Sequence, residues 1–369
     1  MPTYADPEGG RALPAAELLD WTTTVLQRFE TPADIAADVA EVLVAADRRA
    51  IASHGTARLP QYVALIEAGA MDPAARPERL RSKAAIGLFD AHNGWGHHAS
   101  RVAMDAAIEG AAEMGSYTAV VRASNHFGIA GWYALRAADA GLIGISMTNS
   151  SPLVAATRGV DPVLGTNPLA VAAPAGTAGH FCLDMATSTI TRGKVEVASR
   201  RGEELQPGWA LDKEGRPTTD PAAAFEGALL PLGGVEATGG HKGYGLTLLV
   251  DILTGVLGGS TAAPLIIPLF STQGGAADLG QVFMAIDPEA IDEPGAFEAR
   301  LQQELKLLTG SRTAPDAPDR ILIPGEPETA AERRSDERGV VMDLGHHQDL
   351  VEIGGRAGVP FPATTPIGG

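Results

Sequence analysis

Hydrophobic positions first follow a helical period. After Thr31-Pro32-Ala33-Asp34, apolar side chains recur every three or four residues up to about residue 52. The residues on this face are Ile35, Val39, Val42, Leu43 and Ala46. Thr31 offers a capping hydroxyl, Pro32 suits a first turn, and Asp34 places a carboxylate at the positive helix end. The pattern predicts a helix that starts at this segment and runs to about Ala52, with Gly55 as its terminator.

From about residue 84 the pattern alternates between strands and helices. Strands are predicted at 84–88, 117–123, 142–148, 169–173, 180–184 and 281–286, and helices at 98–114, 129–140 and 242–257. Residues 209–218 predict a hairpin around Asp212-Lys213-Glu214-Gly215. Helices return at 297–308, 328–338 and 346–354. We therefore predict an α/β (α+β) fold, with a central α/β domain at 81–289 and a small helical domain built from 1–80 and 290–369.

Composition narrows the class of protein. The 369 residues carry 28 Lys and Arg against 45 Asp and Glu, a net charge of −17 that disfavours nucleic-acid and membrane-surface partners. A hydrophobic content of 45% can fill a core, which excludes disorder as the main state. The single cysteine, Cys182, excludes an intramolecular disulfide and is expected to be a buried strand residue. With no signal-peptide pattern and no apolar run near ~20 residues, we expect a cytoplasmic protein.

The segment Ser53-His54-Gly55, followed by Arg58, is the first candidate for chemistry. An imidazole at a helix C-terminus is favoured in its protonated form, which suits proton donation to a carbonyl oxygen. Arg58 offers a planar fork for a carboxylate. The alternative is that His54 only ends the helix and Arg58 is a solvated charge, because isolated pairs of this kind are common.

Two further candidates follow predicted strands. Ser124-Asn125-His126-Phe127-Gly128 comes after the strand at 117–123, where α/β sheets usually bind ligands, although His126 could instead close the turn structurally. Asp184-Met185-Ala186-Thr187-Ser188 follows the strand at 180–184. Asp184 could orient an imidazole or bind a ribose, but it could equally cap a helix.

A glycine-rich segment precedes the helix at 242–257. In Gly239-Gly240-His241-Lys242-Gly243-Tyr244-Gly245, the glycines admit a ligand to the backbone and Lys242 adds positive charge, which indicates an anion site. An ordinary linker is the alternative, and the P-loop spacing is absent. Gly94-Trp95-Gly96-His97-His98-Ala99 matches a dinucleotide fingerprint, but its side chains are too bulky for a pyrophosphate. No motif predicts a metal site.

Taken in order, seven segments resemble the malate/L-lactate dehydrogenase family that is unrelated to the Rossmann-type enzymes. They are Ser53-His54-Gly55 with Arg58-Leu59-Pro60, Ser124-Asn125-His126-Phe127-Gly128, Gly165-Thr166-Asn167-Pro168-Leu169-Ala170, Asp184-Met185-Ala186-Thr187-Ser188, Gly193-Lys194, Gly240-His241-Lys242-Gly243-Tyr244-Gly245-Leu246 and Pro324-Gly325-Glu326. Together they extend over almost the whole chain. Two departures concern the substrate: Ala52 stands where the family often has an acid, and Leu164 where it often has Tyr.

The resemblance implies a non-Rossmann fold and NAD- or NADP-dependent hydride transfer between a small 2-hydroxy acid, or an imine analogue, and its oxidised partner. It also implies a homodimer with active sites near the subunit interface. By match, His54 and His126 are the candidate acid/base residues, with Asp184 as a further catalytic candidate. Ser53, Arg58 and Thr166 would surround the substrate. The implied cofactor contacts are Ser150, Asp184, Met185, Ala186, Lys242, Gly243, Gly325, Glu326 and Pro327.

Two other classes of function stay open at this point. A cofactor-free lyase or isomerase of hydroxy acids could use His54 and Asp184 as acid and base, but it would leave Lys242 without an anion. A non-catalytic metabolite-binding protein would need no titrating residue. Binding of a nicotinamide cofactor separates both from a dehydrogenase.

Overall fold

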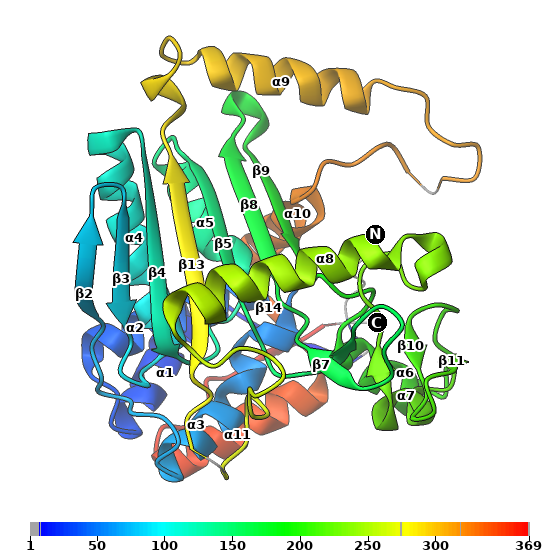
Figure 1. The fold of residues 1–369 in the computed structure, drawn as a ribbon. Coiled ribbons are helices and arrows are strands. Elements are labelled where there is room, and N and C mark those ends of the chain that lie inside the picture. The colour runs from blue at the N-terminus through cyan, green and yellow to red at the C-terminus, as the bar shows by residue number, and fades with distance from the viewer. Residues whose placement is uncertain (1–6, 8, 274, 318, 368–369) are drawn as a thin grey trace.

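A computed structural model describes residues 7, 9–273, 275–317 and 319–367, which form a large mixed sheet flanked by helices (Figure 1). Its strands lie in the order β2-β3-β4-β13-β5-β8-β9. Their bounds are β2 (Glu78–Lys83), β3 (Ile86–Asp90), β4 (Ser116–Ser124), β5 (Ile143–Thr148), β8 (Leu169–Pro174), β9 (His180–Met185) and β13 (Leu279–Ile286). This architecture confirms the predicted α/β class, and each predicted strand lies within a few residues of an observed one.

The pairing of the strands brings the candidate segments to one end of the sheet. Among the described strands of this sheet, β3 and β4 pair in parallel and the other neighbours pair antiparallel. Because β13 is antiparallel to both β4 and β5, and β8 to both β5 and β9, the strands β4, β5 and β9 all run in the same direction. His126 and Ser150 follow the first two, and Asp184 lies near the end of the third. Three distant parts of the sequence therefore lie at the same end of the sheet, which we call the edge where β4, β5 and β9 finish.

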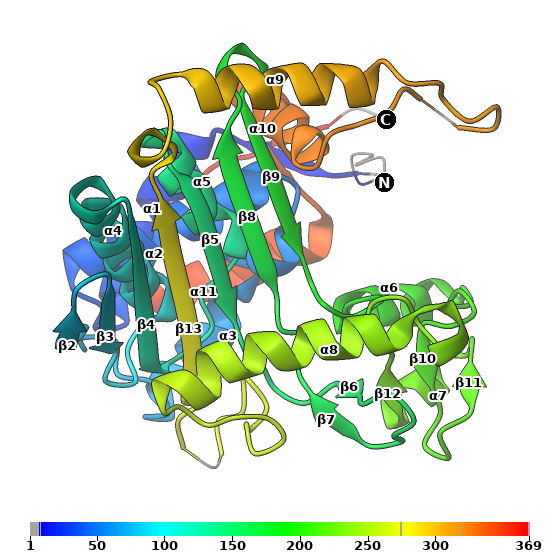
Figure 2. The same cartoon turned by 45° about the horizontal axis from the view of Figure 1, so that its top comes forward.

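Small residues let helices pack closely on the sheet. The helices α4 (Gly96–Met114) and α5 (Ala130–Asp139) cover one face through a core rich in alanine. At Gly144, an added Cβ would lie 2.3 Å from the carbonyl oxygen of Ala134, so only glycine fits there. On the other face, α8 (Gly240–Asp251) and its π-helical continuation Ile252–Val256 cross the end where β4, β5 and β9 finish (Figures 1 and 2).

Helices from both chain ends share a second core. It contains α1 (Ala15–Arg28), α2 (Ala33–Arg48), α3 (Leu59–Glu67) and α11 (Leu344–Ala357), beside a small sheet of β1 (Arg11–Leu13), β14 (Val340–Met342) and β15 (Thr365–Pro366). The helix α10 (Glu326–Arg338) packs against α2. Away from this core, α9 (Ala296–Thr309) lies over the end of β8 and contacts the turn Gly176–Ala178 (Figure 2). The domain limits at 80/81 and 289/290 stay a prediction.

A third, smaller unit follows β5 in the chain. Its sheet has the order β11-β10-β12-β6-β7, with α6 (Arg192–Arg201) and α7 (Pro221–Glu226) beside it. The strands are β6 (Val154–Ala155), β7 (Pro162–Leu164), β10 (Ala210–Leu211), β11 (Pro217–Thr218) and β12 (Ala228–Leu229). The predicted hairpin is confirmed, because β10 and β11 pair antiparallel and Asp212 accepts from the backbone N–H groups of Glu214 and Arg216.

The helix predicted to start at Thr31-Pro32-Ala33-Asp34 is confirmed at its beginning, since α2 starts at Ala33, but its predicted end at about Ala52 is wrong. α2 ends at Arg48, because Ala50 adopts a φ of 58°, and the short 3₁₀ helices Ala52–His54 and Thr56–Arg58 follow. The Thr31 hydroxyl does not cap α2 but accepts from Nε1 of Trp95, which is buried. The helices α1, α3, α6 and α7, the strands β2, β6, β7 and β12, and all three strands of the small terminal sheet were not anticipated. Cys182 is buried on β9, as expected. None of the described helices has the length and apolar character that a membrane span requires.

Candidate active site

His54 and Arg58 lie on the two 3₁₀ helices that follow α2, and Ser53 connects them. The Ser53 hydroxyl lies 2.9 Å from Nδ1 of His54, and Nε of Arg58 donates to the Ser53 carbonyl oxygen at 2.6 Å. The Arg58 guanidinium also lies 5.4 Å from the ring centre of Phe270. These contacts use Nε and the guanidinium face, so the paired terminal N–H groups are the part of Arg58 suited to a carboxylate.

His126 lies directly opposite His54. The two imidazole rings are stacked with centres 5.4 Å apart, so the segments around residues 54 and 126 meet here. Nδ1 of His126 lies 2.7 Å from the Tyr62 hydroxyl and 3.3 Å from the backbone N–H of Gly128. Because a backbone N–H can only donate, Nδ1 of His126 is the acceptor and the ring proton is on Nε2.

Three aromatic residues that the sequence analysis did not propose complete this cluster. Tyr62, one turn beyond Arg58 on α3, is buried between the rings of His126, Trp95 and Phe270. His97 is fully buried, and its Nε2 lies 3.4 Å from the Tyr62 hydroxyl. The spacing of four residues from Arg58 could have indicated Tyr62. Phe270 comes from an irregular loop, where no sequence pattern gives its position.

The histidines of the cluster are neutral near pH 7. Burial, assisted by the charge of Arg58, lowers the pKa of His54 to about 4. Burial also lowers the pKa of His126 well below its usual value, with smaller contributions from His54, His97 and Arg58. The expectation that a helix end favours protonated His54 is therefore wrong, because α2 ends at Arg48 and burial has the larger effect.

Asp184 forms a hydrogen bond with the start of α5. Its Oδ2 accepts from the backbone N–H of Gly131 at 2.7 Å, so the carboxylate occupies the N-terminal end of that helix. Asp184 is exposed on one side, but burial of its carboxylate by the surrounding chain raises the pKa of that group to about 6. Among the contacts of the described residues, none joins Asp184 to His54 or His126. The expectation that Asp184 orients an imidazole therefore finds no support in this geometry.

The Pro324–Pro327 segment lies against the strand that carries Asp184. The backbone N–H of Cys182 donates to the carbonyl oxygen of Pro324, and Gly325 has a φ of 93° with Cys182 next to it. The carboxylate of Glu326 binds Arg320, and Pro327 lies in the first turn of α10. Of the proposed cofactor contacts here, Gly325 brings its backbone against Cys182 in the middle of β9, while the Glu326 carboxylate already has an ionic partner.

Ser150 and Thr166 contact each other beside the end of β9. The Thr166 N–H donates to the Ser150 hydroxyl at 3.0 Å, and the Thr187 hydroxyl donates to the Thr166 carbonyl oxygen at 3.1 Å. Met185 and Ala186, which precede Thr187, are partly exposed. The proposed site residues Ser150, Thr166, Met185 and Ala186 thus lie together where β9 finishes.

Lys242 lies in the first turn of α8, close to the same edge. The next residue, Gly243, packs so tightly on Leu232 that an added Cβ would lie 2.1 Å from its carbonyl oxygen. The Leu232 N–H in turn donates to the Thr187 carbonyl oxygen. Lys242 is exposed, and no ion pair of its ammonium group occurs among the described residues. An unpaired lysine at a helix N-terminus is suited to an anion.

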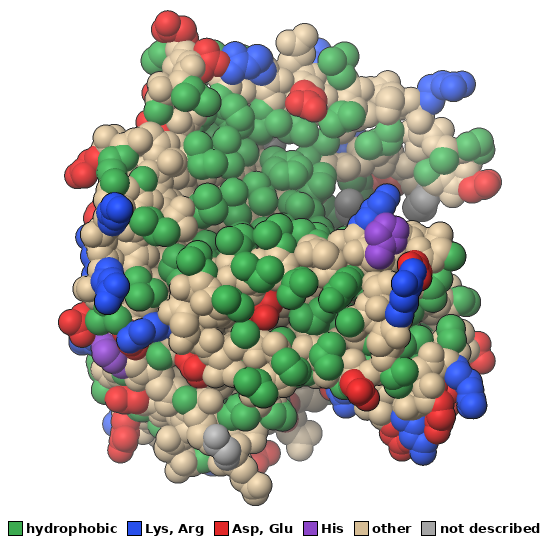
Figure 3. Space-filling model, in the orientation of Figure 1, with side chains coloured by type: hydrophobic (Ala, Val, Ile, Leu, Met, Phe, Trp, Pro, Cys, Tyr) green, Lys and Arg blue, Asp and Glu red, His purple; other side chains and the backbone are tan. Residues whose placement is uncertain are grey.

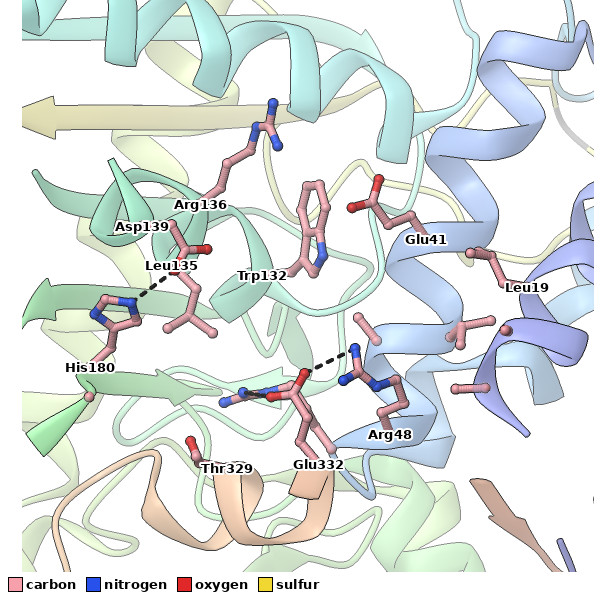
Figure 4. Close-up of a pocket in the computed structure, with 16 residues that line it drawn as sticks. Leu19, Glu41, Arg48, Trp132, Leu135, Arg136, Asp139, His180, Thr329 and Glu332 are labelled. Carbon is pink, nitrogen blue, oxygen red and sulfur yellow. Dashed lines mark hydrogen bonds and ion pairs between the residues drawn. The ribbon is translucent and has the colours of Figure 1, made fainter. Parts of the chain in front are cut away.

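Two other regions do not form part of this site. In the segment Gly94–Ala99, an added Cβ at Gly96 would lie 2.1 Å from the Asn125 carbonyl oxygen, so this backbone is closed to a pyrophosphate. A cavity of about 530 Å³ lies between α2, α5 and α10 (Figure 4). Its Arg48 and His180 are bound to Glu332 and Asp139. No group of three or more His, Cys, Asp or Glu side chains in the described parts of the chain could hold a metal ion.

Comparison with known proteins gives a consistent picture. The model of the malate/L-lactate dehydrogenase family matches residues 13–351. A malate dehydrogenase of Pyrococcus abyssi is 42% identical over 350 residues, covering 94% of this chain and 95% of that protein. An NAD(+)-dependent ureidoglycolate dehydrogenase of Escherichia coli O157:H7 is 36% identical, covering 86% and 88%. The structure of malate dehydrogenase from Pyrococcus horikoshii OT3 superposes with a TM-score of 0.89 at 38% identity, covering 97% and 99%.

Proposed function

Because the chain belongs to the malate/L-lactate dehydrogenase family, we propose that it transfers a hydride between a nicotinamide cofactor and a small 2-hydroxy or 2-oxo acid, with the His54–His126 pair as acid/base and Arg58 as the carboxylate ligand. It is an NAD(P)-dependent oxidoreductase that acts on CH–OH groups, in line with relatives named for NAD(+) and for NADP(+). The single observation that carries the proposal is the stacking of His54 on His126 next to Arg58.

The edge where β4, β5 and β9 finish fits a dinucleotide. Lys242, unpaired at the N-terminus of α8, suits a pyrophosphate, and the exposed side of Asp184 suits ribose hydroxyl groups. Ser150, Met185, Ala186 and the backbone at Gly325 would complete the contacts. When bound there, the nicotinamide supplies or accepts the hydride.

The chain's own side chains handle the carboxylate and the proton. Arg58, held by Ser53 and Phe270, would bind the carboxylate through its terminal N–H groups, and Thr166 would also contact the substrate. The histidine pair would hold the proton at the C2 oxygen. Tyr62 and Gly128 keep Nδ1 of His126 occupied, so Nε2 is the atom of that ring available to the substrate.

Substrate binding would also prepare the proton. The charge of Arg58 lowers the pKa of both His54 and His126. A carboxylate bound to Arg58 offsets that charge and therefore raises both pKa values, although burial, the larger cause of their lowering, remains. Protonation of the pair is thus coupled to the arrival of the acid substrate. The histidine pair would therefore take up the proton needed for reduction when the substrate binds.

The substrate class is tested with a panel of 2-oxo acids. Pyruvate, oxaloacetate, 3-sulfopyruvate and the cyclic imine Δ1-piperideine-2-carboxylate are each supplied with NADH and with NADPH, and loss of nicotinamide absorbance is followed. The imine belongs in the panel because a Δ1-piperideine-2-carboxylate reductase of Pseudomonas syringae has the same fold at a TM-score of 0.83 and 29% identity. Turnover of at least one of these substrates supports the proposal. Absence of nicotinamide binding by calorimetry would contradict it.

An apolar surface supports a homodimer. Figure 3 shows hydrophobic side chains spread over the sheet between α8 and α9. Strand alternation puts Ile145, Val171 and Leu183 on this face, and all three are partly exposed. Exposed leucine, isoleucine and valine residues of α8 and its continuation, and of α9, extend the same surface. A patch of this kind marks an interaction site, and in a chain of net charge −17 an apolar face is where a second copy meets the least repulsion. A cytoplasmic location stays a prediction.

A further inference from the structure

Thr56 is buried at the centre of the segment that carries the proposed acid/base and carboxylate residues. It lies two residues after His54 and two before Arg58, and it is fully inaccessible to solvent. Its neighbours come from two other helices: Asp47 from the last turn of α2 and His346 from the first turn of α11. Both neighbours are also buried. This turn is thus joined both to the helix that precedes it and to the distant helix α11.

The hydrogen bonds in this group have a defined direction. The Thr56 N–H donates to Oδ2 of Asp47 at 2.9 Å, and the Thr56 hydroxyl donates to the same oxygen at 2.6 Å. That bond uses the only hydrogen of the hydroxyl, so the Thr56 oxygen accepts from Nε2 of His346 at 2.9 Å. His346 therefore donates to Thr56, and Thr56 donates to Asp47. Thr56 is the residue that connects the other two to the segment of the site.

The fit around Asp47 leaves the segment little room to move. At Gly55, an added Cβ would lie 1.9 Å from Oδ1 of Asp47, so the carboxylate lies flat against the backbone of the segment. Oδ1 is buried without a hydrogen-bond partner, which makes both bonds to Oδ2 more important for holding the charge. Burial raises the pKa of Asp47, while the charge of His346 and the bonds from Thr56 oppose that rise.

We propose that Asp47, Thr56 and His346 are positioning residues that hold His54 and Arg58 at the spacing the reaction requires. This inference rests on the proposed function, because it concerns the same two side chains. Among the hydrogen bonds of the described residues, none joins Asp47, Thr56 or His346 to the side chain of His54 or Arg58. Their effect is geometric, and displacements of about 1 Å at a reacting group can lower a rate about a hundredfold.

Substitution of Thr56 provides the first test. Thr56→Val keeps the shape of the side chain but removes the hydroxyl, whereas Thr56→Ser keeps the hydroxyl. For the best 2-oxo acid of the panel, we expect kcat/KM to fall at least tenfold in Thr56→Val and to stay within threefold of wild type in Thr56→Ser. Binding of oxamate to the NADH complex, measured by calorimetry, should weaken at least fivefold in the valine variant. Binding of NADH alone should change less than twofold.

His346 provides a second test that does not depend on the folding of the first variant. Gln can place its amide N–H where Nε2 of the imidazole lies, whereas Leu cannot donate. We expect His346→Leu to lose activity and oxamate affinity as Thr56→Val does, and His346→Gln to recover most of both. His347→Leu is the matched control on the same helix, since the ring of His347 contacts Thr364 rather than Thr56.

The outcomes separate this inference from the proposed function. Wild-type protein that neither binds NADH nor reduces any 2-oxo acid contradicts the proposed function. Wild-type protein that is active, with Thr56→Val or His346→Leu folded and equally active, overturns the positioning role alone. An equal loss in His346→Gln and His346→Leu would also overturn it, since the lost donor would then not be the cause.

Discussion

The Tyr62 hydroxyl lies 2.7 Å from Nδ1 of His126 and is buried beneath it. On the other side, the same hydroxyl is 3.4 Å from Nε2 of His97. Since Nδ1 of His126 already accepts from the Gly128 N–H, Tyr62 must donate to it, and the hydroxyl oxygen is left to accept from His97. The buried pair of Tyr62 and His97 thus sets which nitrogen of His126 carries the proton.

Tyr62→Phe removes this bond and keeps the ring packed. We expect kcat to fall roughly 10- to 100-fold, within the range that one positioned proton-transfer group contributes, while NADH affinity stays within twofold. Steady-state kinetics with the best 2-oxo acid and NADH titration check both quantities. A kcat equal to that of the wild type would mean that the Tyr62 hydroxyl has no part in holding His126.

The lowered pKa values of the histidines predict an unusual pH profile. With the pKa of His54 at about 4 in the free protein, the protonated form is already scarce at pH 6. The kcat/KM for reduction should therefore fall about tenfold for each pH unit between pH 6 and 8. The kcat profile should bend at a higher pH, because bound carboxylate offsets Arg58. A kcat/KM that stays level up to pH 6.5 would contradict this.

His97 makes the fold sensitive to acid. Burial, with a smaller contribution from His54, lowers its pKa to about 3, compared with about 6.5 for an exposed histidine. As the pH falls below 6.5, the unfolded chain takes up the proton first, and stability is lost. Between pH 7.5 and pH 5, this residue should cost about 2 kcal/mol of unfolding free energy.

Denaturant unfolding of His97→Gln checks this cost. The loss of stability between pH 7.5 and pH 5 should be smaller in the variant by that amount, whatever the substitution itself costs at pH 7.5. His241→Gln is the control, because His241 is exposed on α8. The same pH dependence in wild type and His97→Gln would show that His97 is not buried in its neutral form.

The apolar surface on α8 predicts a dimer that charge can separate. Leu249 and Val256 are 49% and 60% exposed. Replacing both by Glu should convert a dimer into a monomer, because each copy would bring buried negative charge to the interface. Light scattering on a sizing column measures the mass, and Met114→Glu, at the end of α4, is the control. Wild type that is monomeric at 50 µM would contradict the dimer.

The strand pattern and the segments that carry the candidate catalytic residues could be predicted from the sequence. The stacking of the His54 and His126 rings could not. Periodicity found β4, β5 and β9, and the polar residues after them showed where ligands would bind. The contact of His54 with His126 depends on how the helices of the second core pack against the end of β4, and no local pattern encodes it. The neutrality of His54 was missed because Ala50 turns the chain early and moves the imidazole into the cluster. Thr56 was not singled out, since its partners are nine and 290 positions away.

The proposed roles of His54 and His126 are tested most directly by replacing each with Gln and measuring single-turnover reduction together with NADH affinity. The account predicts that at least one variant reduces the 2-oxo acid a hundredfold more slowly or worse, while both bind NADH within twofold of wild type. If both variants react at the wild-type rate, the stacked pair is not the source of the proton.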